Sequence, residues 1–173
     1  MLGSNYNKNK NANKVIESIN RIEFSISIEV QVHVLGDLHD YCAFPQVRTL
    51  PPGANDEQIS DFLGECDVFV YSSPADTFPS ILIEAQAMGV AVVACDIGGV
   101  TETFEDAISG LSVKNLNGEL EKTLIGLLNN PDKIEEMKKS AQKIASKYSY
   151  KSIGEKHREL YQELVSRDQL SEK

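Results

Sequence analysis

Apolar residues follow two different spacings along this chain. Five short runs, mostly rich in β-branched or aromatic residues, are bounded by glycine, proline or polar residues, which is typical of strands. They are Ile26–Leu35, Val47–Leu50, Asp67–Tyr71, Val90–Ala94 and Gly110–Val113. Elsewhere apolar residues recur every three or four positions, which predicts helices. These helices are expected around Val15–Ile22, Asp56–Leu63, Pro79–Met88, Leu120–Leu128, Asp132–Tyr148 and Tyr150–Val165.

The alternation of strands and helices predicts an α/β fold, with a Rossmann-like parallel sheet and helices on both faces. The run Val90–Ala94 is apolar at every position, as expected for a strand covered on both sides. Leu2-Gly3 is expected to be the end of a first strand. One domain is expected over residues 1–165, followed by a C-terminal tail at 166–173. No G-x-G-x-x-G follows a strand, which disfavours a nicotinamide-binding domain.

Composition and charge disfavour several classes of ligand and location. The chain has 173 residues and a net charge of −9, which disfavours nucleic acid and anionic lipid as ligands. No apolar run is long enough to span a bilayer, and the polar N-terminus lacks a signal-peptide core. We therefore expect a cytoplasmic protein with no transmembrane segment. The three cysteines have no C-x-x-C spacing and the three histidines are scattered, so no metal site is expected.

The stretch from Asp76 to Glu102 contains the candidate chemistry. Asp76 precedes a predicted helix that begins at Pro79, and Glu84 lies about two turns inside that helix. A helix N-terminus presents free N–H groups and a partial positive charge, so it can hold a phosphate. An acid on each side can bind hydroxyl groups. A phosphate flanked by sugar hydroxyls is the shape of a nucleotide-sugar.

Two further features support a ligand site here. Gly98-Gly99 follows the buried run Val90–Ala94, and glycines there let backbone approach a ligand closely. Asp76 follows the run Asp67–Tyr71, and ligands of open α/β sheets bind outside the carboxyl ends of strands.

Each feature also has a purely structural explanation. An acid before a helix commonly stabilises its dipole, and a glycine pair commonly makes a turn. Glu84 is the one charge in a helix that is apolar nearly all round, so it is expected to be buried and to need a donor. A ribose hydroxyl would serve, and so would a salt bridge or a backbone cap.

The whole stretch from Asp76 to Glu102 resembles the C-terminal half of a retaining glycosyltransferase of family 4 with the GT-B fold. Its sequence is DTFPSILIEAQAMGVAVVACDIGGVTE. The family has two acids separated by seven residues and then a G-G-x-x-E turn. Here these are Asp76 and Glu84, followed by Gly98-Gly99-Val100-Thr101-Glu102. The resemblance continues from Glu105 to Val113.

The resemblance implies a nucleotide-diphosphate sugar as donor and no metal or other cofactor. It implies that Asp76 contacts the transferred sugar and that Glu84 binds the ribose. Backbone amides near Phe78, Pro79 and Ser80, together with Lys10, would hold the diphosphate. Two departures stand out: the family's arginine position falls on Ser4 or Asn5, and Asp76 replaces the usual glutamate.

The resemblance covers the donor half of such enzymes, so their N-terminal acceptor domain is expected to be absent from this chain. The resemblance therefore implies the donor half of a glycosyltransferase, inactive alone, that acts with an N-terminal domain or a partner chain. The transferred sugar would go to a glycan or a lipid-linked sugar in polysaccharide or glycolipid synthesis, with the complete enzyme either cytoplasmic or peripheral to a membrane. The alternative is a non-catalytic, nucleotide-sugar-binding subunit. Another GT-B enzyme, such as an epimerase or a phosphorylase, is a weaker option.

Overall fold

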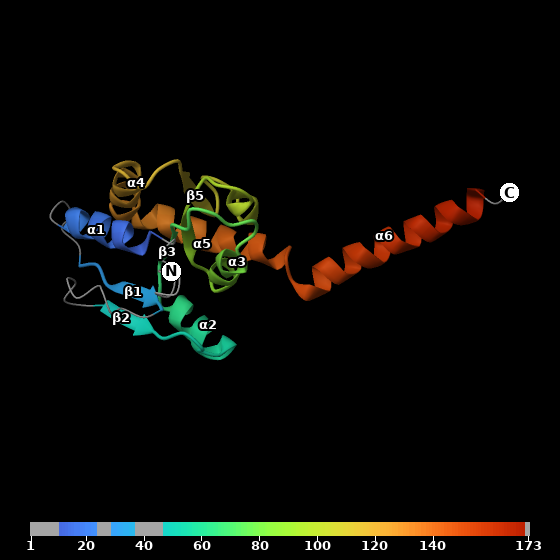
Figure 1. The fold of residues 1–173 in the computed structure, drawn as a ribbon, viewed down its shortest axis with the longest axis horizontal. Helices are drawn as coiled ribbons and strands as arrows, with labels where there is room; N and C mark the ends of the chain where they lie inside the picture. The colour runs from blue at the N-terminus through green and yellow to red at the C-terminus, as the bar shows by residue number, and fades with distance from the viewer. Residues whose placement is uncertain (1–10, 24–28, 37–46, 172–173) are drawn as a thin grey trace.

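The structure, a computed structural model, describes residues 11–23, 29–36 and 47–171 (Figure 1). The helices are α1 (Ala12–Glu23), α2 (Asp56–Gly64), α3 (Ser80–Ala87), η1 (Val100–Thr103, a 3₁₀ helix), α4 (Glu119–Leu128), α5 (Pro131–Ser146) and α6 (Tyr150–Ser171). The strands are β1 (Val32–Leu35), β2 (Val47–Leu50), β3 (Val68–Tyr71), β4 (Ala91–Cys95) and β5 (Gly110–Val113). Every helix and strand that was predicted within the described residues is present. Part of the predicted strand Ile26–Leu35, residues 26–28, lies outside the described residues, as does Leu2-Gly3.

The strands form two parallel sheets rather than one in the described part of the chain. β3, β4 and β5 make one sheet, in the order β3-β4-β5, and β1 pairs with β2 in the other. All five side chains of β4 are buried, which follows from its position between two neighbours under covered faces. The predicted parallel α/β fold is confirmed, with a division between β1 and β3.

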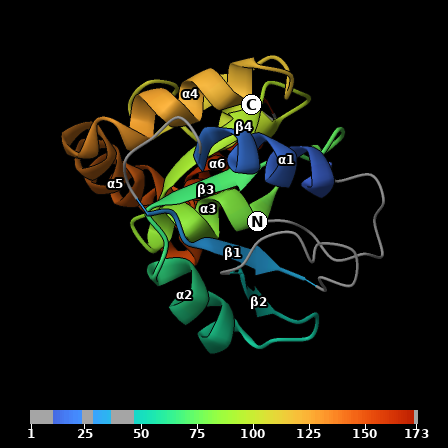
Figure 2. The ribbon, with the colours of Figure 1, turned by 90° about the vertical axis from the view of Figure 1, so that its left-hand side faces the viewer.

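Helices cover both faces of the strands (Figure 2). On one face, apolar side chains of α1, α4 and α5 form a core with alternate residues of β1, β4 and β5. On the other, α2, α3 and η1 form a second core with the remaining residues of β3 and β4. Because successive residues of a strand point to opposite faces, β4 must be apolar throughout. The run Val90–Ala94 is therefore apolar at every position because its side chains pack alternately into the two cores.

Side-chain caps set the start of two helices. Asn55 begins α2 with a capping box: its side chain accepts from the amide of Gln58, whose side chain accepts from the amide of Asn55. Asn130 caps α5, and Pro131 follows at its start. At α3 the boundary is shifted by one residue. Pro79 is the N-cap, and Ser80 is the first helical residue.

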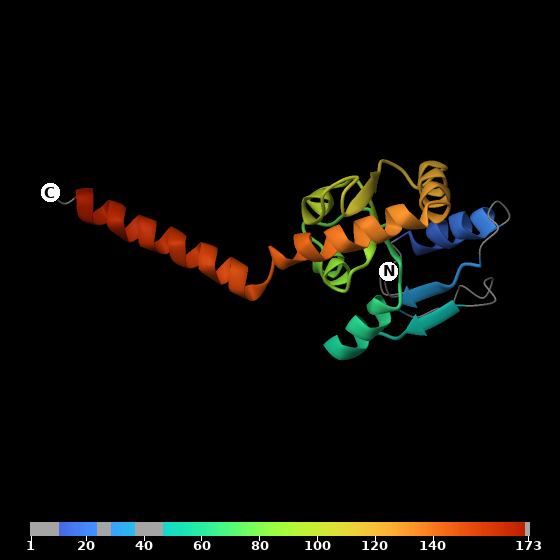
Figure 3. The same cartoon turned by 180° about the vertical axis from the view of Figure 1, so that it is seen from behind.

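The last helix, α6, projects away from the two sheets (Figures 1 and 3). It continues to Ser171, past the end that the sequence predicted at Val165. Its apolar side chains are largely exposed: the exposed fraction is 50% for Leu160, 62% for Tyr161, 48% for Leu164 and 59% for Val165. No helix in the described part of the chain has the length and apolar character needed to cross a membrane.

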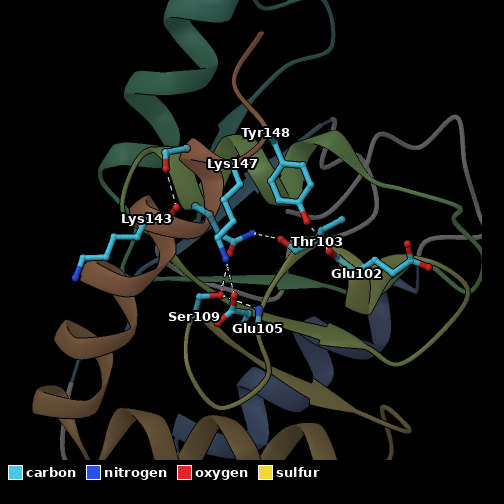
Figure 4. Close-up of polar contacts among 9 residues, drawn as sticks. Glu102, Thr103, Glu105, Ser109, Lys143, Lys147 and Tyr148 are labelled. Atoms are coloured by element: carbon cyan, nitrogen blue, oxygen red, sulfur yellow. Dashed lines mark hydrogen bonds and ion pairs between the residues drawn. The ribbon is translucent and has the colours of Figure 1, made fainter. Parts of the chain in front are cut away.

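A buried polar network joins α3 to η1 and to the start of β5. The side-chain amide of Gln86, which is fully buried, donates to the carbonyls of Leu82 at 3.0 Å and Thr103 at 2.7 Å. Its side-chain oxygen accepts from the hydroxyl of Ser109 at 3.0 Å, which in turn accepts from the amide of Glu105 at 3.0 Å. Figure 4 shows Thr103, Ser109 and Glu105 in this network. Gln86 therefore holds together the segments on either side of the glycine turn.

We predict that Gln86→Leu destabilises the protein. Leucine has a similar size but leaves the Ser109 hydroxyl and the Thr103 carbonyl without their partner, which costs about 1–3 kcal/mol for each buried group. Urea unfolding followed by circular dichroism measures the change. The control is Gln162→Leu, because Gln162 is exposed on α6; its effect should stay within about 0.5 kcal/mol. Equal effects of the two substitutions would contradict the role assigned to the network.

Candidate functional site

Two loops meet at the carboxyl edge of the three-stranded sheet. One follows β3 and contains Asp76 and Thr77, and the other follows β4 and contains Gly98 and Gly99. A Cβ atom at Gly98 would overlap the carbonyl oxygen of Asp76, and one at Gly99 would overlap that of Thr77. Gly98 also has a φ of +50°, a value that favours glycine. The glycines therefore admit the chain's own Asp76–Thr77 backbone, whereas the sequence analysis expected them to admit a ligand.

Asp76 is held in place by two hydrogen bonds. The hydroxyl of Tyr71, at the end of β3, donates to Oδ2, and the amide of Phe78 donates to Oδ1 at 3.2 Å. The side chain is half-buried. An ionised carboxylate has about four lone-pair positions, so these two bonds leave acceptor capacity for an external hydroxyl. Asp76 is thus an oriented acceptor at the end of β3.

Tyr71 has a strongly altered pKa. Burial, together with the hydrogen bond to Asp76, raises the pKa of Tyr71 to about 12. Burial disfavours the charged phenolate, and the nearby carboxylate disfavours it further. Tyr71 therefore stays protonated at neutral pH and remains a donor to Asp76.

Glu84 lies on the solvent face of α3, which corrects the expectation that it is buried. The side chains of Leu82, Ala85 and Gln86 face the core, and Ser80 and Glu84 are exposed. The buried polar residue of this helix is Gln86, which carries no charge and has three hydrogen-bond partners: the carbonyls of Leu82 and Thr103 and the hydroxyl of Ser109. Residues four apart lie on the same helix face, about 6 Å apart along the axis. Glu84 therefore shares an exposed stripe with Ser80 at the start of α3.

The predicted phosphate-binding amides are only partly available. Pro79 has no N–H, and it is buried. The amide of Phe78 already donates to Asp76. The donors at this end of α3 are the amides of Ser80 and Ile81, the first two helical residues, because the amide of Leu82 already donates to the carbonyl of Pro79 at 3.1 Å. The amides available to a phosphate are thus those of Ser80 and Ile81, rather than those of Phe78–Ser80.

The aromatic ring of Phe78 is half exposed and touches the end of α5. Its centroid lies 5.7 Å from that of Tyr148, and the hydroxyl of Tyr148 donates to the carbonyl of Glu102 at 2.8 Å. Next to it, Lys147 pairs with Glu105 at 2.8 Å (Figure 4). An exposed pair of this kind contributes little stability. These contacts attach α5 to both loops of the site.

The amino end of α1 lies at the same edge. The side-chain amide of Asn11 donates to the carbonyl of Ser72, just after β3, at 3.1 Å. Lys10, a predicted diphosphate ligand, lies outside the described residues. Asn11 itself lies beside the segment that leads from β3 to Asp76.

Tyr71, Tyr148 and Gln86 were not found as site residues from the sequence. Tyr71 could have been found, because it ends a strand whose following loop contains Asp76. Tyr148 and Gln86 had no such signal: their contacts join segments that are 46 and 17 residues apart. Together the described residues provide an oriented carboxylate, a helix N-terminus and an exposed acid one turn along. This arrangement can bind a polar ligand with hydroxyl groups and a phosphate.

The sequence of residues 4–144 matches the family described as glycosyl transferases group 1. Two curated relatives are each 32% identical to the chain. One is an N,N'-diacetylbacillosaminyl-diphospho-undecaprenol α-1,3-N-acetylgalactosaminyltransferase of Campylobacter jejuni, matched over 62% of this chain and 29% of the relative. The other is a D-inositol 3-phosphate glycosyltransferase of Corynebacterium urealyticum, matched over 68% and 28%. The chain thus spans less than a third of the length of these relatives.

Solved structures have the same fold. An Anabaena protein (HepE) crystallised with UDP has a TM-score of 0.74 at 20% identity, over 94% of this chain and 48% of that one. The C-terminal domain of a glycosyl transferase group 1 family protein from Francisella tularensis has a TM-score of 0.71 at 18% identity. In that case the match covers 86% of this chain and 84% of the other. The fold is that of the C-terminal half of a GT-B glycosyltransferase.

We predict that Tyr71→Phe removes a component of the pH dependence of stability. The pKa of Tyr71 is about 12 in the folded protein and about 10 in an unfolded chain. As pH rises from 10 to 12, the unfolded state loses this proton first, so the free energy of unfolding falls. Phenylalanine has no such proton. Urea unfolding at pH 9 to 12 should therefore show a steeper decline for the parent than for Tyr71→Phe.

The control for this prediction is Tyr161→Phe, which changes an exposed ring on α6. It should keep the decline of the parent protein. Identical profiles for the parent and Tyr71→Phe would mean that the hydroxyl of Tyr71 is not held as the structure indicates.

Proposed function

This chain belongs to the glycosyl transferases group 1 family, and we propose that it is the donor-binding domain of a retaining, family 4 glycosyltransferase. Its ligand in this proposal is a nucleotide-diphosphate sugar. The observation that carries the proposal is the position of Asp76. Its carboxylate is fixed by Tyr71 and by the amide of Phe78, directly ahead of the N-terminus of α3.

Each part of the donor has a partner in this arrangement. Asp76 accepts hydrogen bonds from hydroxyl groups of the transferred sugar. It uses the lone pairs that are not occupied by Tyr71 and Phe78. The amides of the first turn of α3 and Lys10 hold the diphosphate. Glu84 binds the ribose hydroxyls from the exposed stripe of α3. The exposure of Glu84 supports this role, because a ligand can reach the carboxylate without displacing a core residue.

The reaction in this proposal breaks the bond between the sugar and the diphosphate. Negative charge develops on the leaving diphosphate as the bond breaks. A helix N-terminus and a lysine stabilise that charge without having to reorganise, which is an electrostatic form of catalysis. We propose that no metal ion is needed, since these groups provide the positive charge that a metal would otherwise supply.

The similar proteins support a nucleotide-sugar donor and suggest a class of acceptor. HepE has this fold and was crystallised with UDP. The Campylobacter relative transfers N-acetylgalactosamine to a sugar linked through diphosphate to undecaprenol, as its name states. We propose a glycan or lipid-linked sugar as acceptor for this protein, in polysaccharide or glycolipid synthesis. The reaction would take place in the cytoplasm or at the cytoplasmic surface of a membrane.

Transfer in this proposal requires a second domain that binds the acceptor. The chain covers 48% of the length of HepE, and the described residues contain a single α/β unit. The exposed apolar side chains of α6 are a suitable contact for that domain, because apolar surface of this kind marks interaction sites. A partner chain or a covalently linked domain would serve equally. The match to a transferase family favours this proposal over a non-catalytic subunit.

We predict that the chain binds one of UDP, GDP and ADP in calorimetric titrations without added metal. Glu84→Ala should weaken that binding at least tenfold, which corresponds to about 1.4 kcal/mol, because the ribose loses its acceptor. The control is Glu136→Ala, which removes an exposed acid on α5. It should leave the dissociation constant unchanged. Failure to bind any of the three nucleotides would contradict the proposal.

We also predict that the purified chain transfers no sugar by itself. The assay measures radioactive sugar moved from a nucleotide-diphosphate donor to lipid-linked or free glycan acceptors. The expected result is binding of donor without sustained transfer, since no acceptor domain orients the incoming hydroxyl. Steady turnover by the chain alone would show that one domain is sufficient.

A further inference from the structure

Tyr148 lies in the short connection between α5 and α6 and contacts both loops of the candidate site. Its amide donates to the carbonyl of Ala145 at 2.9 Å, which continues the end of α5. Its ring lies against that of Phe78, with 5.7 Å between the centroids, and its hydroxyl donates to the carbonyl of Glu102 at 2.8 Å (Figure 4). One side chain therefore reaches the loop after β3 with its ring and the segment after the glycine turn with its hydroxyl.

These two contacts form a second attachment between segments that already meet once. The first attachment is the close approach of Gly99 to the carbonyl of Thr77. Tyr148 acts on the next residue of the first loop and on a carbonyl that lies beyond the glycines. Two bodies that touch at one place can still rotate about it, whereas a second attachment removes that rotation. Tyr148 therefore fixes the orientation of the loop after β3, in addition to its distance from the glycine turn.

Phe78 connects this second attachment to the Asp76 carboxylate. Its amide donates to Oδ1 of Asp76 at 3.2 Å. Its ring is 43% exposed, so the core of the protein does not enclose it. The contact with Tyr148 is therefore what limits the positions of the ring. A shift of Phe78 moves a hydrogen-bond donor of Asp76 and so alters the direction of the carboxylate.

The end of α5 gives Tyr148 a firm support. Ile144 and Ala145, in the preceding turn, are buried, and α5 packs against α3. The neighbouring Lys147 differs from Tyr148 in its contacts. Its ion pair with Glu105 is about half exposed at both ends, so the pair contributes little. Lys147 therefore provides a matched control one residue away.

We propose that Tyr148 is a positioning residue for the donor. It holds the loop after β3 in the orientation in which the Asp76 carboxylate meets the transferred sugar, and it acts through Phe78 and the carbonyl of Glu102. This inference rests on the proposed function, since it takes Asp76 as the group that binds the sugar. α3, which contains the proposed ribose ligand, is attached separately through Gln86. Loss of Tyr148 should therefore affect the sugar end of the donor more than its nucleotide end.

The first measurement needs no ligand. Hydrogen exchange of single amides is followed by NMR in the full chain for Tyr148→Leu, Tyr148→Phe and the control Lys147→Met. Tyr148→Leu should speed exchange at the amide of Phe78 at least about fivefold, because the loop opens more often. Tyr148→Phe keeps the ring and should lie between Tyr148→Leu and the parent. Lys147→Met should match the parent. The amide of Gln58, in the cap of α2, should be unchanged throughout, which separates local opening from general loosening.

The second measurement compares two ligands that differ only in the sugar. UDP-glucose, GDP-mannose and ADP-glucose are each titrated beside the matching diphosphate, without added metal. For the pair that binds, Tyr148→Leu should weaken the sugar nucleotide at least about tenfold and the diphosphate less than about threefold. Lys147→Met should change neither. In a Phe78→Leu background, Tyr148→Leu should have little further effect, because both substitutions break the same connection to Asp76.

Three results would overturn the inference. One is unchanged exchange at Phe78 in Tyr148→Leu, whatever the titrations show. Another is an equal loss of affinity for the sugar nucleotide and the diphosphate, which would indicate a general role in stability. The third is full additivity with Phe78→Leu. Faster exchange at Phe78 without binding of any sugar nucleotide would instead contradict the proposed function on which the inference rests, so the two failures are distinguishable.

Discussion

The contact between the Gly98-Gly99 turn and the carbonyls of Asp76 and Thr77 is the constraint on which the candidate site depends. It fits two loops from neighbouring strands against each other without any intervening side chain. A residue larger than glycine at either position would have to push the Asp76 loop away. That loop sets the position of the carboxylate and the start of α3. The two glycines and the two acids therefore belong to one unit, although the chain separates Asp76 from Gly98 by a whole helix and strand.

Contacts from three other elements hold the two loops and α3 in position around this contact. Tyr71 fixes the Asp76 carboxylate from the end of β3, while Gln86 attaches α3 to the segment that follows the glycine turn. Tyr148 joins the end of α5 to both, through the ring of Phe78 and the carbonyl of Glu102. Each of these contacts comes from a different element. The site is consequently rigid where Asp76 lies and open to solvent along the stripe of Ser80 and Glu84.

Much of this could be predicted from the sequence, because local signals determine it. Apolar spacing predicted the helices, and the evenly apolar run at β4 predicted a strand covered on both faces. The error at Glu84 shows what local signals leave out. The helix reads as apolar nearly all round, so its one charge was expected inside. Its buried polar residue is instead Gln86, because an uncharged amide can satisfy its groups with carbonyls and a hydroxyl brought together by folding. Thr103 and Ser109 lie 17 and 23 residues away in the sequence, so no local pattern around Gln86 predicts them as partners.

The division of the sheet and the candidate site are connected through β3. One edge of β3 pairs with β4, and no described strand pairs with its other edge. The last residue of β3, Tyr71, donates a hydrogen bond to Asp76. The ladder to β4 therefore positions the end of β3, and Tyr71 transmits that position to the carboxylate. The placement of Asp76 thus depends on the pairing of β3 as well as on the loop that contains it.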